Sequence, residues 1–399
     1  MSITEVLNVV RNYMVELPEE LTEEQLREQI EIVVINNKNL YGYDFKKAKE
    51  IIDRVYYSIR SEVSILQGYI DDPEVVEIMV NGIDNIFVEK GGKLLKTDMK
   101  FESVIELETV MRRIAGKLQR EINELNPIVD ARLKSGERVN CVYKNIALNG
   151  PIITIRKFAP NGFTMEDLIE FGTISKEAAK FLEVLVNCKY NIFVSGGTSS
   201  GKTTFLNVLS NFIPQNERVI IIEDSAELQV NSINNIVRLE CKDSTSSGNN
   251  EIGMDQLIKT SLRMRPDRII VGEIRGKEIL DMLSAMNTGH DGSLSTGHGN
   301  SVVGMLKRLE SMYLQAANFP IEAIRNQISE GIDIIVHLGR LPDMSRKVLE
   351  ISEIIGTKDN QISINTLFEY KVDEGLIRTN NKIKNCNKLN LYNGGDTIG

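Results

Sequence analysis

The stretch from Gly196 to Thr203, Gly-Gly-Thr-Ser-Ser-Gly-Lys-Thr, matches the phosphate-binding pattern G-x-x-x-x-G-K-[ST]. Glycines let the backbone turn so that its N–H groups point inward and form a nest for phosphate oxygens. Lys202 can reach the β- and γ-phosphates, and the Thr203 hydroxyl can bind Mg²⁺. The alternative is a chance glycine-rich turn. The predicted binding residues for ATP and Mg²⁺ are Gly196, Gly197, Thr198, Ser199, Ser200, Gly201, Lys202, Thr203 and Thr204.

The sequence on both sides of this loop predicts the elements that a phosphate loop requires. Residues 191–195, Asn-Ile-Phe-Val-Ser, form a short apolar run typical of a buried strand. After the loop, apolar residues recur at helical spacing at positions 205, 206, 208, 209 and 212. This order of strand, loop and helix brings a helix N-terminus, with its favourable dipole, to the phosphate.

Hydrolysis of ATP also needs a carboxylate that positions or deprotonates water. Glu273 follows an apolar strand at 267–271, where a second acidic motif is expected. A usual version would place Asp before it, but Gly272 stands there, which favours Glu273 as the water-activating base over a direct metal ligand. The alternative is an exposed glutamate in a loop.

A second pair of carboxylates, Glu223 and Asp224, ends the apolar run 218–222. They would hold Mg²⁺ through water or help to polarise the attacking water. The alternative is a helix N-cap made by Asp224 or Ser225. The predicted metal ligands are Thr203, Glu223 and Glu273.

Two of the three histidines, His290 and His298, lie in the glycine-rich segment 288–300. They are too few for a zinc site because no cysteine or third histidine joins them. We predict that both histidines sense the γ-phosphate as hydrogen-bond donors, with packing within the loop as the alternative. His337 lies in an apolar run and is expected to be a core residue.

Three arginines, Arg132, Arg138 and Arg156, precede the phosphate loop by some distance. An arginine that reaches a γ-phosphate from elsewhere stabilises the transition state. On the residues alone, surface salt bridges are the favoured interpretation.

The chain changes character along its length. The first segment is helical and charged, and Thr22-Glu23-Glu24-Gln25 resembles a capping box. A compact α+β pattern follows, and later strands alternate with helices, which is typical of a parallel sheet covered on both faces. The predicted segments are a helical extension (1–66), an α+β domain (67–158), a linker (159–164), an α/β phosphate-loop domain (165–380), with a mobile loop at 241–253, and a frayed tail (381–399).

Composition limits the function further. The 399 residues carry a formal net charge of -9, which argues against a general nucleic-acid-binding surface. No apolar run is long enough for a transmembrane helix, and no secretory signal is visible. Four scattered cysteines give neither a zinc site nor a disulfide framework. We expect a cytoplasmic protein that can dock on a membrane partner.

Together these motifs resemble the type II/type IV secretion ATPase superfamily. The resemblance rests on the phosphate loop, the acidic box 222–228, the second acidic motif 265–276 and the histidine segment 288–300. The Gly-Glu ending of the second acidic motif is usual in that superfamily. Within it, residues 72–82, 130–140 and 148–158 resemble the tight-adherence (Tad) pilus-assembly ATPases, and the absence of paired C-x-x-C motifs argues against the general secretion branch.

The resemblance implies a RecA-like ATPase domain with a mobile N-terminal domain, assembled as a homohexamer. Its sites would lie between the two domains near subunit boundaries, which makes Arg132, Arg138 and Arg156 candidates for nucleotide contact. ATP turnover would drive pilin assembly or protein secretion through an inner-membrane platform protein at the inner face of the cytoplasmic membrane. The alternatives are a DNA-transport motor of the conjugation type and a nucleotide-binding scaffold that hydrolyses little ATP.

Overall fold

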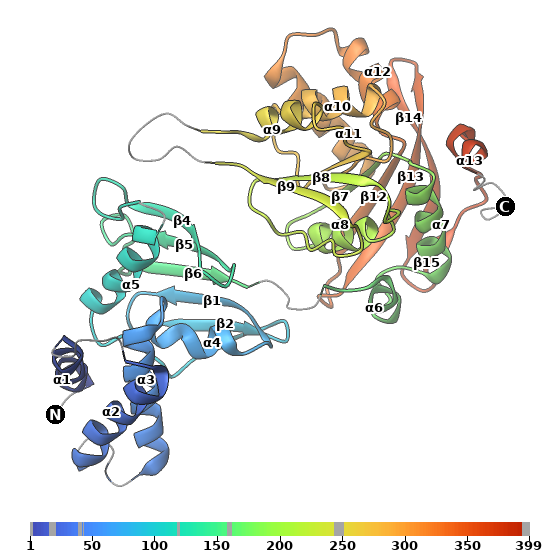
Figure 1. Cartoon of the computed structure of the whole chain (residues 1–399). Coiled ribbons are helices and arrows are strands. Elements are labelled where there is room, and N and C mark those ends of the chain that lie inside the picture. Colours follow the sequence, from blue (N-terminus) through green and yellow to red (C-terminus); the bar gives the residue numbers. More distant parts are fainter. Residues whose placement is uncertain are drawn as a thin grey trace. The chain divides into compact units, whose positions relative to one another are not determined.

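The computed structural model of the chain describes residues 3–15, 21–38, 42, 44–117, 120–157, 162–242 and 251–392. It divides into two units, Met1–Pro160 and Asn161–Gly399, each with its own sheet (Figure 1). Residues 159–161, half of the linker predicted at 159–164, lie outside the described residues. The centre of the loop predicted at 241–253, residues 243–250, also lies outside the described residues.

Three helices open the first unit: α1 (Ile3–Val15), α2 (Glu23–Asn36) and α3 (Phe45–Arg60). The predicted capping box is present, because the Thr22 hydroxyl accepts from the Gln25 N–H and the Gln25 side chain accepts from the Thr22 N–H. Apolar residues at helical spacing on these helices form a small core of their own, including Leu26, Ile30 and Val55.

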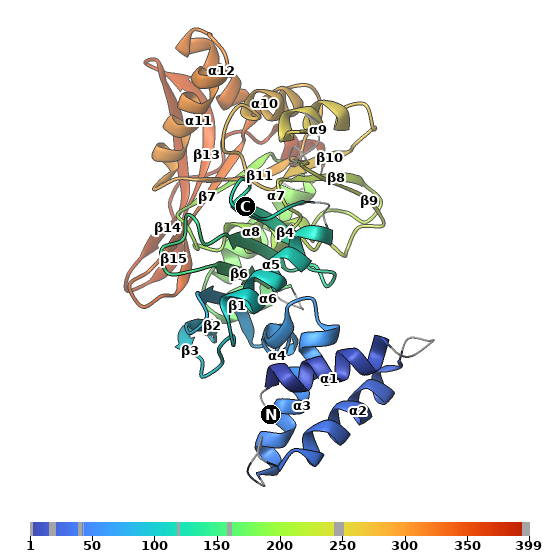
Figure 2. The ribbon, with the colours of Figure 1, turned by 90° about the vertical axis from the view of Figure 1, so that its left-hand side faces the viewer.

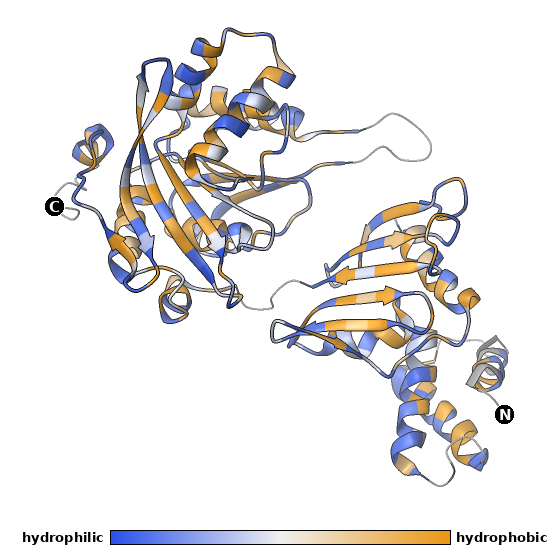
Figure 3. Cartoon of the chain, turned by 180° about the vertical axis from the view of Figure 1, so that it is seen from behind, coloured by the Kyte–Doolittle hydropathy of each residue, from blue (hydrophilic) through white to orange (hydrophobic). Residues whose placement is uncertain are grey.

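An antiparallel sheet of six strands completes the first unit, in the order β3-β2-β1-β6-β5-β4. Helix α5 packs on it through Leu107, Met111 and Ile114. Hydrophobic residues dominate its strands in Figure 3. The bounds are η2 (Ser64–Leu66), α4 (Gln67–Asp71), β1 (Val75–Asn81), β2 (Ile86–Lys90), β3 (Lys93–Lys96), α5 (Val104–Lys117), β4 (Ile128–Arg132), β5 (Arg138–Val142) and β6 (Ile152–Arg156).

The second unit contains a sheet of nine strands in the order β15-β14-β13-β12-β7-β11-β10-β8-β9. The six strands from β12 to β9 are parallel, as the sequence predicted, but β13, β14 and β15 extend the sheet with antiparallel pairs. The predicted parallel sheet is therefore present, and the antiparallel strands β13, β14 and β15 are an addition that the sequence did not indicate. The strand bounds are β7 (Ile192–Gly196), β8 (Arg218–Glu223), β9 (Asn235–Glu240), β10 (Arg268–Val271), β11 (Leu294–His298), β12 (Ile334–Arg340), β13 (Arg346–Lys358), β14 (Gln361–Lys371) and β15 (Gly375–Arg378).

Side chains that alternate along the central strands cover both faces of this sheet. Val219 and Ile221 of β8 join the core under α6, α7 and α8, whereas Ile220 and Ile222 join the core under α10, α11 and α12. The two helical layers are separate in Figures 1 and 2. The helix bounds are α6 (Met165–Glu170), α7 (Lys176–Asn187), α8 (Lys202–Ser210), α9 (Met254–Ser261), α10 (Ile279–Asn287), α11 (Val302–Ala316), α12 (Ile321–Gly331) and α13 (Asn387–Leu391).

The prediction of a frayed tail from residue 381 is wrong for residues 381–392. The buried Glu353 carboxylate on β13 accepts hydrogen bonds from the backbone N–H groups of Lys384 and Asn385. In α13, Leu389 is buried and Lys388 pairs with Asp333 at 2.7 Å. The polar composition of residues 381–392 gave no indication of these contacts, because a single buried carboxylate can order a segment that has few apolar residues.

Within the described ranges, no helix is long and apolar enough to cross a membrane. The four cysteines all lie in the described residues and none of them forms a disulfide; two of them, Cys141 and Cys188, are buried.

Candidate active site

The phosphate loop joins the end of β7 to the start of α8, in the order that the sequence predicted. Gly196 allows the loop to begin against a neighbouring strand, because a Cβ there would lie 2.6 Å from the Leu338 carbonyl oxygen. Ser199 and Gly201 have positive φ values of 57° and 93°. These turns present successive N–H groups to one side of the loop, as an anion nest requires.

Lys202 is buried, with 7% of the residue's surface exposed. Its Nζ donates to the Gly197 carbonyl oxygen at 2.9 Å and lies 3.3 Å from Nδ1 of His298. Burial lowers the pKa of Lys202, and the Glu273 carboxylate opposes that shift. No carboxylate lies within ion-pairing distance of Lys202 among the residues that the structure describes. The ammonium group is thus poised for an incoming anion.

Glu273 lies just beyond the end of β10 and faces both His298 and Arg275. One oxygen, Oε2, accepts from Arg275 at 2.9 Å. The other, Oε1, lies 2.9 Å from His298 Nε2, close enough for an ion pair. The pair is misaligned for a hydrogen bond, so within the described residues this buried oxygen has no hydrogen-bond partner. An oxygen in that state is suited to accept a proton or to bind water.

Burial lowers the pKa of His298, and the nearby Lys202 ammonium lowers it further, while Glu273 acts in the opposite direction. With its neutral ring, Nδ1 can accept from Lys202 while Nε2–H faces Glu273. His298 therefore joins the phosphate-loop lysine to the carboxylate in one chain of contacts.

Glu223, at the end of β8, is nearly inaccessible, with 3% exposed. Its Oε1 accepts from the backbone N–H groups of Glu227 and Leu228, at 2.7 and 2.9 Å. Burial nonetheless raises its pKa. A Cβ on Gly272 would lie 3.1 Å from Cγ of Glu223, a tight contact that favours glycine over aspartate at the position before Glu273.

Asp224 is exposed and pairs with Arg275 at 3.3 Å, so that Arg275 bridges the two acidic motifs. Residues 225–234 form no helix, which excludes the N-cap alternative for Asp224. Arg275 was not singled out in the sequence, although it lies two residues after Glu273.

The structure separates the two histidines. His298 ends β11 beside the phosphate loop, paired with Gly196 across the sheet. His290 precedes the same strand, and its Nδ1 lies 3.3 Å from the Ala285 carbonyl oxygen. The strand between them spans at least about 13 Å. His290 therefore lies at the opposite end of the sheet from the phosphate loop of its own chain, and its contact with a γ-phosphate stays a prediction.

His337 lies on β12 with 7% exposed and its Nδ1 3.3 Å from Ser195 Oγ. Burial lowers its pKa. This is the core position that its apolar surroundings predicted.

The predicted metal ligands fit Mg²⁺ only together with a nucleotide. Within the described ranges, no group of three or more His, Cys, Asp and Glu side chains could hold a metal ion. Mg²⁺ usually keeps several waters and takes one or two protein ligands plus phosphate oxygens. Thr203 at the start of α8 and the open oxygen of Glu273 suit that arrangement. Glu223 suits it less directly, because one of its oxygens already accepts two backbone bonds.

In the first unit, the three predicted arginines form one row across the sheet. Arg132 of β4 pairs in register with Arg138 of β5, and Arg138 pairs with Arg156 of β6. Glu77 of β1 faces Arg156 from the other side. Residues directly opposite one another project from the same face, so three guanidinium groups gather at one end of the sheet. Sequence spacing alone did not reveal this row.

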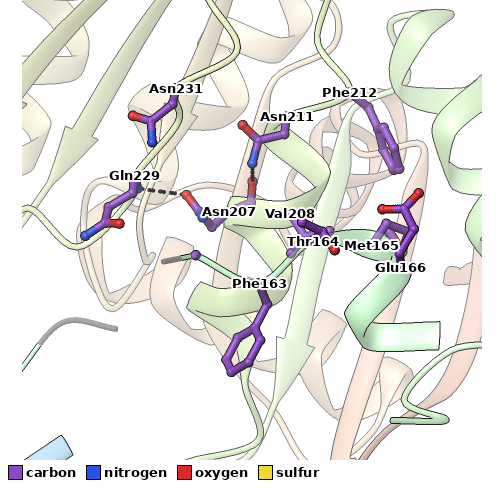
Figure 4. A pocket seen from close by; sticks show the side chains of 11 residues that line it. Phe163, Thr164, Met165, Glu166, Asn207, Val208, Asn211, Phe212, Gln229 and Asn231 are labelled. Atoms are coloured by element: carbon purple, nitrogen blue, oxygen red, sulfur yellow. Dashed lines mark hydrogen bonds between the residues drawn. The ribbon is translucent and has the colours of Figure 1, made fainter. Parts of the chain in front are cut away.

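Beside α8 lies a hollow of about 300 Å³ (Figure 4). It is bounded by the start of α6, one face of α8 and the segment after β8. The Asn207 side chain joins α8 to the segment after β8 by accepting from the Gln229 backbone N–H at 2.8 Å. Its lining combines amides with aromatic rings, from Phe163, Asn207, Asn211, Phe212, Gln229 and Asn231. Amide groups in such a hollow can bind polar edges of a small molecule.

Comparisons with known proteins agree with this architecture. A model of the family described as type II/IV secretion system protein matches residues 60–390. The probable conjugal transfer protein TrbB of Sinorhizobium fredii is 33% identical over 289 residues, which cover 71% of this chain and 85% of TrbB. An uncharacterized protein of Methanocaldococcus jannaschii is 41% identical over 249 residues, or 61% of this chain, and the match spans only 34% of that protein's length.

Among solved structures, the ATPase DotB of Legionella pneumophila matches with a TM-score of 0.54 and 20% identity, over 74% of this chain and 80% of DotB. This likeness concerns the fold. It agrees with the predicted α/β class and is consistent with a RecA-like ATPase fold.

Proposed function

Because the chain belongs to the type II/IV secretion system protein family, we propose that it is an Mg²⁺-dependent ATPase that powers secretion or pilus assembly. The observation that carries this proposal is the chain of contacts at the ends of β7, β10 and β11. There a buried lysine without a carboxylate partner in the described structure faces His298, which in turn faces an unsatisfied Glu273 oxygen. These three residues combine a cation that can bind phosphate with a carboxylate that can deprotonate water.

Each residue then has a distinct role. The nest formed by residues 196–203 and the Lys202 ammonium bind the phosphates. Glu273 orients the attacking water and takes its proton. His298 contacts the γ-phosphate once Lys202 has turned from its ring toward the nucleotide. Mg²⁺, held by Thr203 and by Glu273 or Glu223 through water, would neutralise charge that develops on the phosphates.

We further propose that the active assembly is a homohexamer. The arginine row Arg132, Arg138 and Arg156 belongs to the first unit, and three guanidinium groups that project from one face of its sheet concentrate positive charge there, which favours an anion such as a γ-phosphate. In a ring, that anion would be a nucleotide of the same or a neighbouring subunit. Turnover would then be coupled to movement between the two units.

For the cargo, we propose pilin assembly through an inner-membrane platform protein, which places the chain at the cytoplasmic face of that membrane. The tight-adherence motifs at 72–82, 130–140 and 148–158 support this choice. The 33% identity with TrbB favours a second candidate, a conjugation-type motor that serves DNA transport. The net charge of -9 argues against direct DNA contact in either case.

The proposal is tested by the rate of phosphate release from ATP at increasing protein concentration, with and without Mg²⁺. A specific rate that rises with concentration and needs Mg²⁺ is expected for a site completed by a neighbouring subunit. Vesicles that carry the platform protein should raise the rate, whereas single-stranded DNA should not. A chain that binds ATP but releases no phosphate at any concentration, even on those vesicles, would instead be a scaffold.

A further inference from the structure

The hairpin of β12 and β13 reaches past the end of β7 to the phosphate loop. Strand β12 runs parallel to β7, with Leu338 in register with Gly196. Its next residues therefore extend beyond the point where β7 ends and the loop begins. The turn at 341–345 is closed by Asp343, which accepts from the backbone and the hydroxyl of Ser345. The chain then returns as β13, whose first residue is Arg346.

Arg346 contacts the phosphate loop from its outer side. Its Nε donates to the Ser199 carbonyl oxygen at 3.0 Å, across 147 residues of sequence. Its aliphatic stem lies over Gly201, where an added Cβ would be 3.4 Å from Cδ of Arg346. The contact therefore falls on the two loop residues with positive φ, Ser199 and Gly201.

This contact matters for phosphate binding because the Ser199 carbonyl group belongs to the anion-binding nest of the loop. In a nest the N–H groups point toward the anion, so the carbonyl groups between them point outward. Ser199 holds a left-handed conformation that is uncommon for a residue other than glycine. A cationic donor on the Ser199 carbonyl fixes that peptide and polarises it, which makes the following N–H a stronger donor. This N–H, that of Ser200, makes only a long bond of 3.4 Å to the Gly197 carbonyl oxygen within the loop, and a phosphate oxygen would be the better acceptor.

We propose that Arg346 is a positioning residue for nucleotide binding, which holds the Ser199–Ser200 peptide in the phosphate-binding orientation. This inference rests on the proposed ATPase function. Arg346 acts through the loop and does not itself touch the nucleotide. It therefore governs how tightly ADP and ATP bind more than how fast bound ATP reacts.

Three substitutions of Arg346 separate the contribution of its charge from that of its hydrogen bond to Ser199. Arg346→Met removes both, Arg346→Gln keeps an N–H donor without charge, and Arg346→Lys keeps the charge and a donor. The matched control is Lys347→Met, which removes the same charge one residue along β13, where Lys347 instead donates to the Phe171 and Gly172 carbonyl oxygens. All four chains are compared with wild type by titration of a fluorescent ADP analogue and by steady-state ATP hydrolysis.

We expect Arg346→Met to raise the Kd for ADP about tenfold, the size of a charge-assisted hydrogen bond at an exposed position. The KM for ATP should rise similarly, while kcat changes less than about threefold. Arg346→Lys should stay within about threefold of wild type, with Arg346→Gln between the two. Lys347→Met should bind ADP as wild type does.

The inference is overturned if Arg346→Met binds ADP within about twofold of wild type. It is also overturned if Lys347→Met weakens ADP binding equally, since the weaker binding would then come from the loss of any positive charge and not from the contact with Ser199. If Arg346→Met does not fold, the pair Arg346→Lys and Arg346→Gln decides, and equal affinities contradict the proposal. A wild-type chain that binds neither ADP nor ATP overturns the proposed function and this inference together.

Discussion

Buried charged side chains lie at both ends of the strands in the nine-stranded sheet, but the two ends differ in how completely those side chains are paired and hydrogen-bonded. At the edge where β10 and β12 begin, the fully buried Arg268 forms a two-pronged pair with Glu217 and also donates to the Val186 carbonyl oxygen. Asp333 there accepts from Lys388 and from the Asn191 backbone. At the edge where β7, β10 and β11 end, Lys202 has only neutral partners and one Glu273 oxygen has no hydrogen bond within the described residues.

This difference separates structural charge from charge kept for a ligand. A buried ion whose bonding capacity is filled stabilises one arrangement and has nothing left to offer a substrate. A buried ion with unfilled capacity is destabilising until a ligand supplies the missing partner. By this criterion, the edge with Lys202, Glu273 and His298 is the reactive one.

The largest effect is expected from Lys202→Met. Nucleotide binding should weaken by at least about a hundredfold, because the loop loses its only lysine charge toward the phosphates. The melting temperature should equal or exceed that of wild type, since burial of the ammonium is itself unfavourable. Titration with ADP and thermal unfolding check the two halves of this prediction. A large fall in melting temperature would mean that Lys202 is structural.

Arg268→Met tests the opposite edge. It removes the close partner of the half-buried Glu217 carboxylate and leaves it only Lys189, 3.9 Å away, so we expect a loss of about 3 kcal/mol in the free energy of unfolding. Chemical denaturation measures that loss. Nucleotide affinity of the fraction that stays folded should match wild type. A stable variant with weakened ADP binding would contradict the division between the two edges.

The histidines offer a smaller, paired test. His298→Gln should lower kcat/KM for ATP about tenfold or more, since the ring links Lys202 to Glu273. His290→Gln should leave it within about twofold. Initial rates for both variants in the same buffer provide the comparison. Equal losses would restore the view that both histidines serve one phosphate.

The smallest effect concerns pH. The pKa of His298 is lowered in the folded chain by burial and by Lys202, so the unfolded chain binds more protons just below pH 6.5. Stability should therefore rise with pH through that window, and wild type should lose stability relative to His298→Gln as pH falls from about 7 to about 5. Melting temperatures of the two chains across this range, without nucleotide, measure the difference. A constant difference would exclude the proposed lowering.

The sequence was informative where local chemistry determines structure. The loop 196–203 and its flanking strand and helix follow from residue types that tolerate few other arrangements. Glu273 could be chosen because it follows an apolar strand, and His298 because it lies in the glycine-rich segment 288–300, but His290 could not be distinguished from His298 without knowing on which side of β11 it lies. Arg346 depends on the register between β7 and β12, which is a long-range property that no local pattern encodes.

The most direct test of the account is Glu273→Gln, assayed beside wild type for ATP binding and phosphate release. The substitution preserves shape and removes the base, so we predict ATP affinity within about threefold of wild type and turnover lowered by about a hundredfold or more. Unchanged turnover at every protein concentration would contradict the assignment of Glu273, and with it the claim that the unsatisfied charges at this edge perform the reaction.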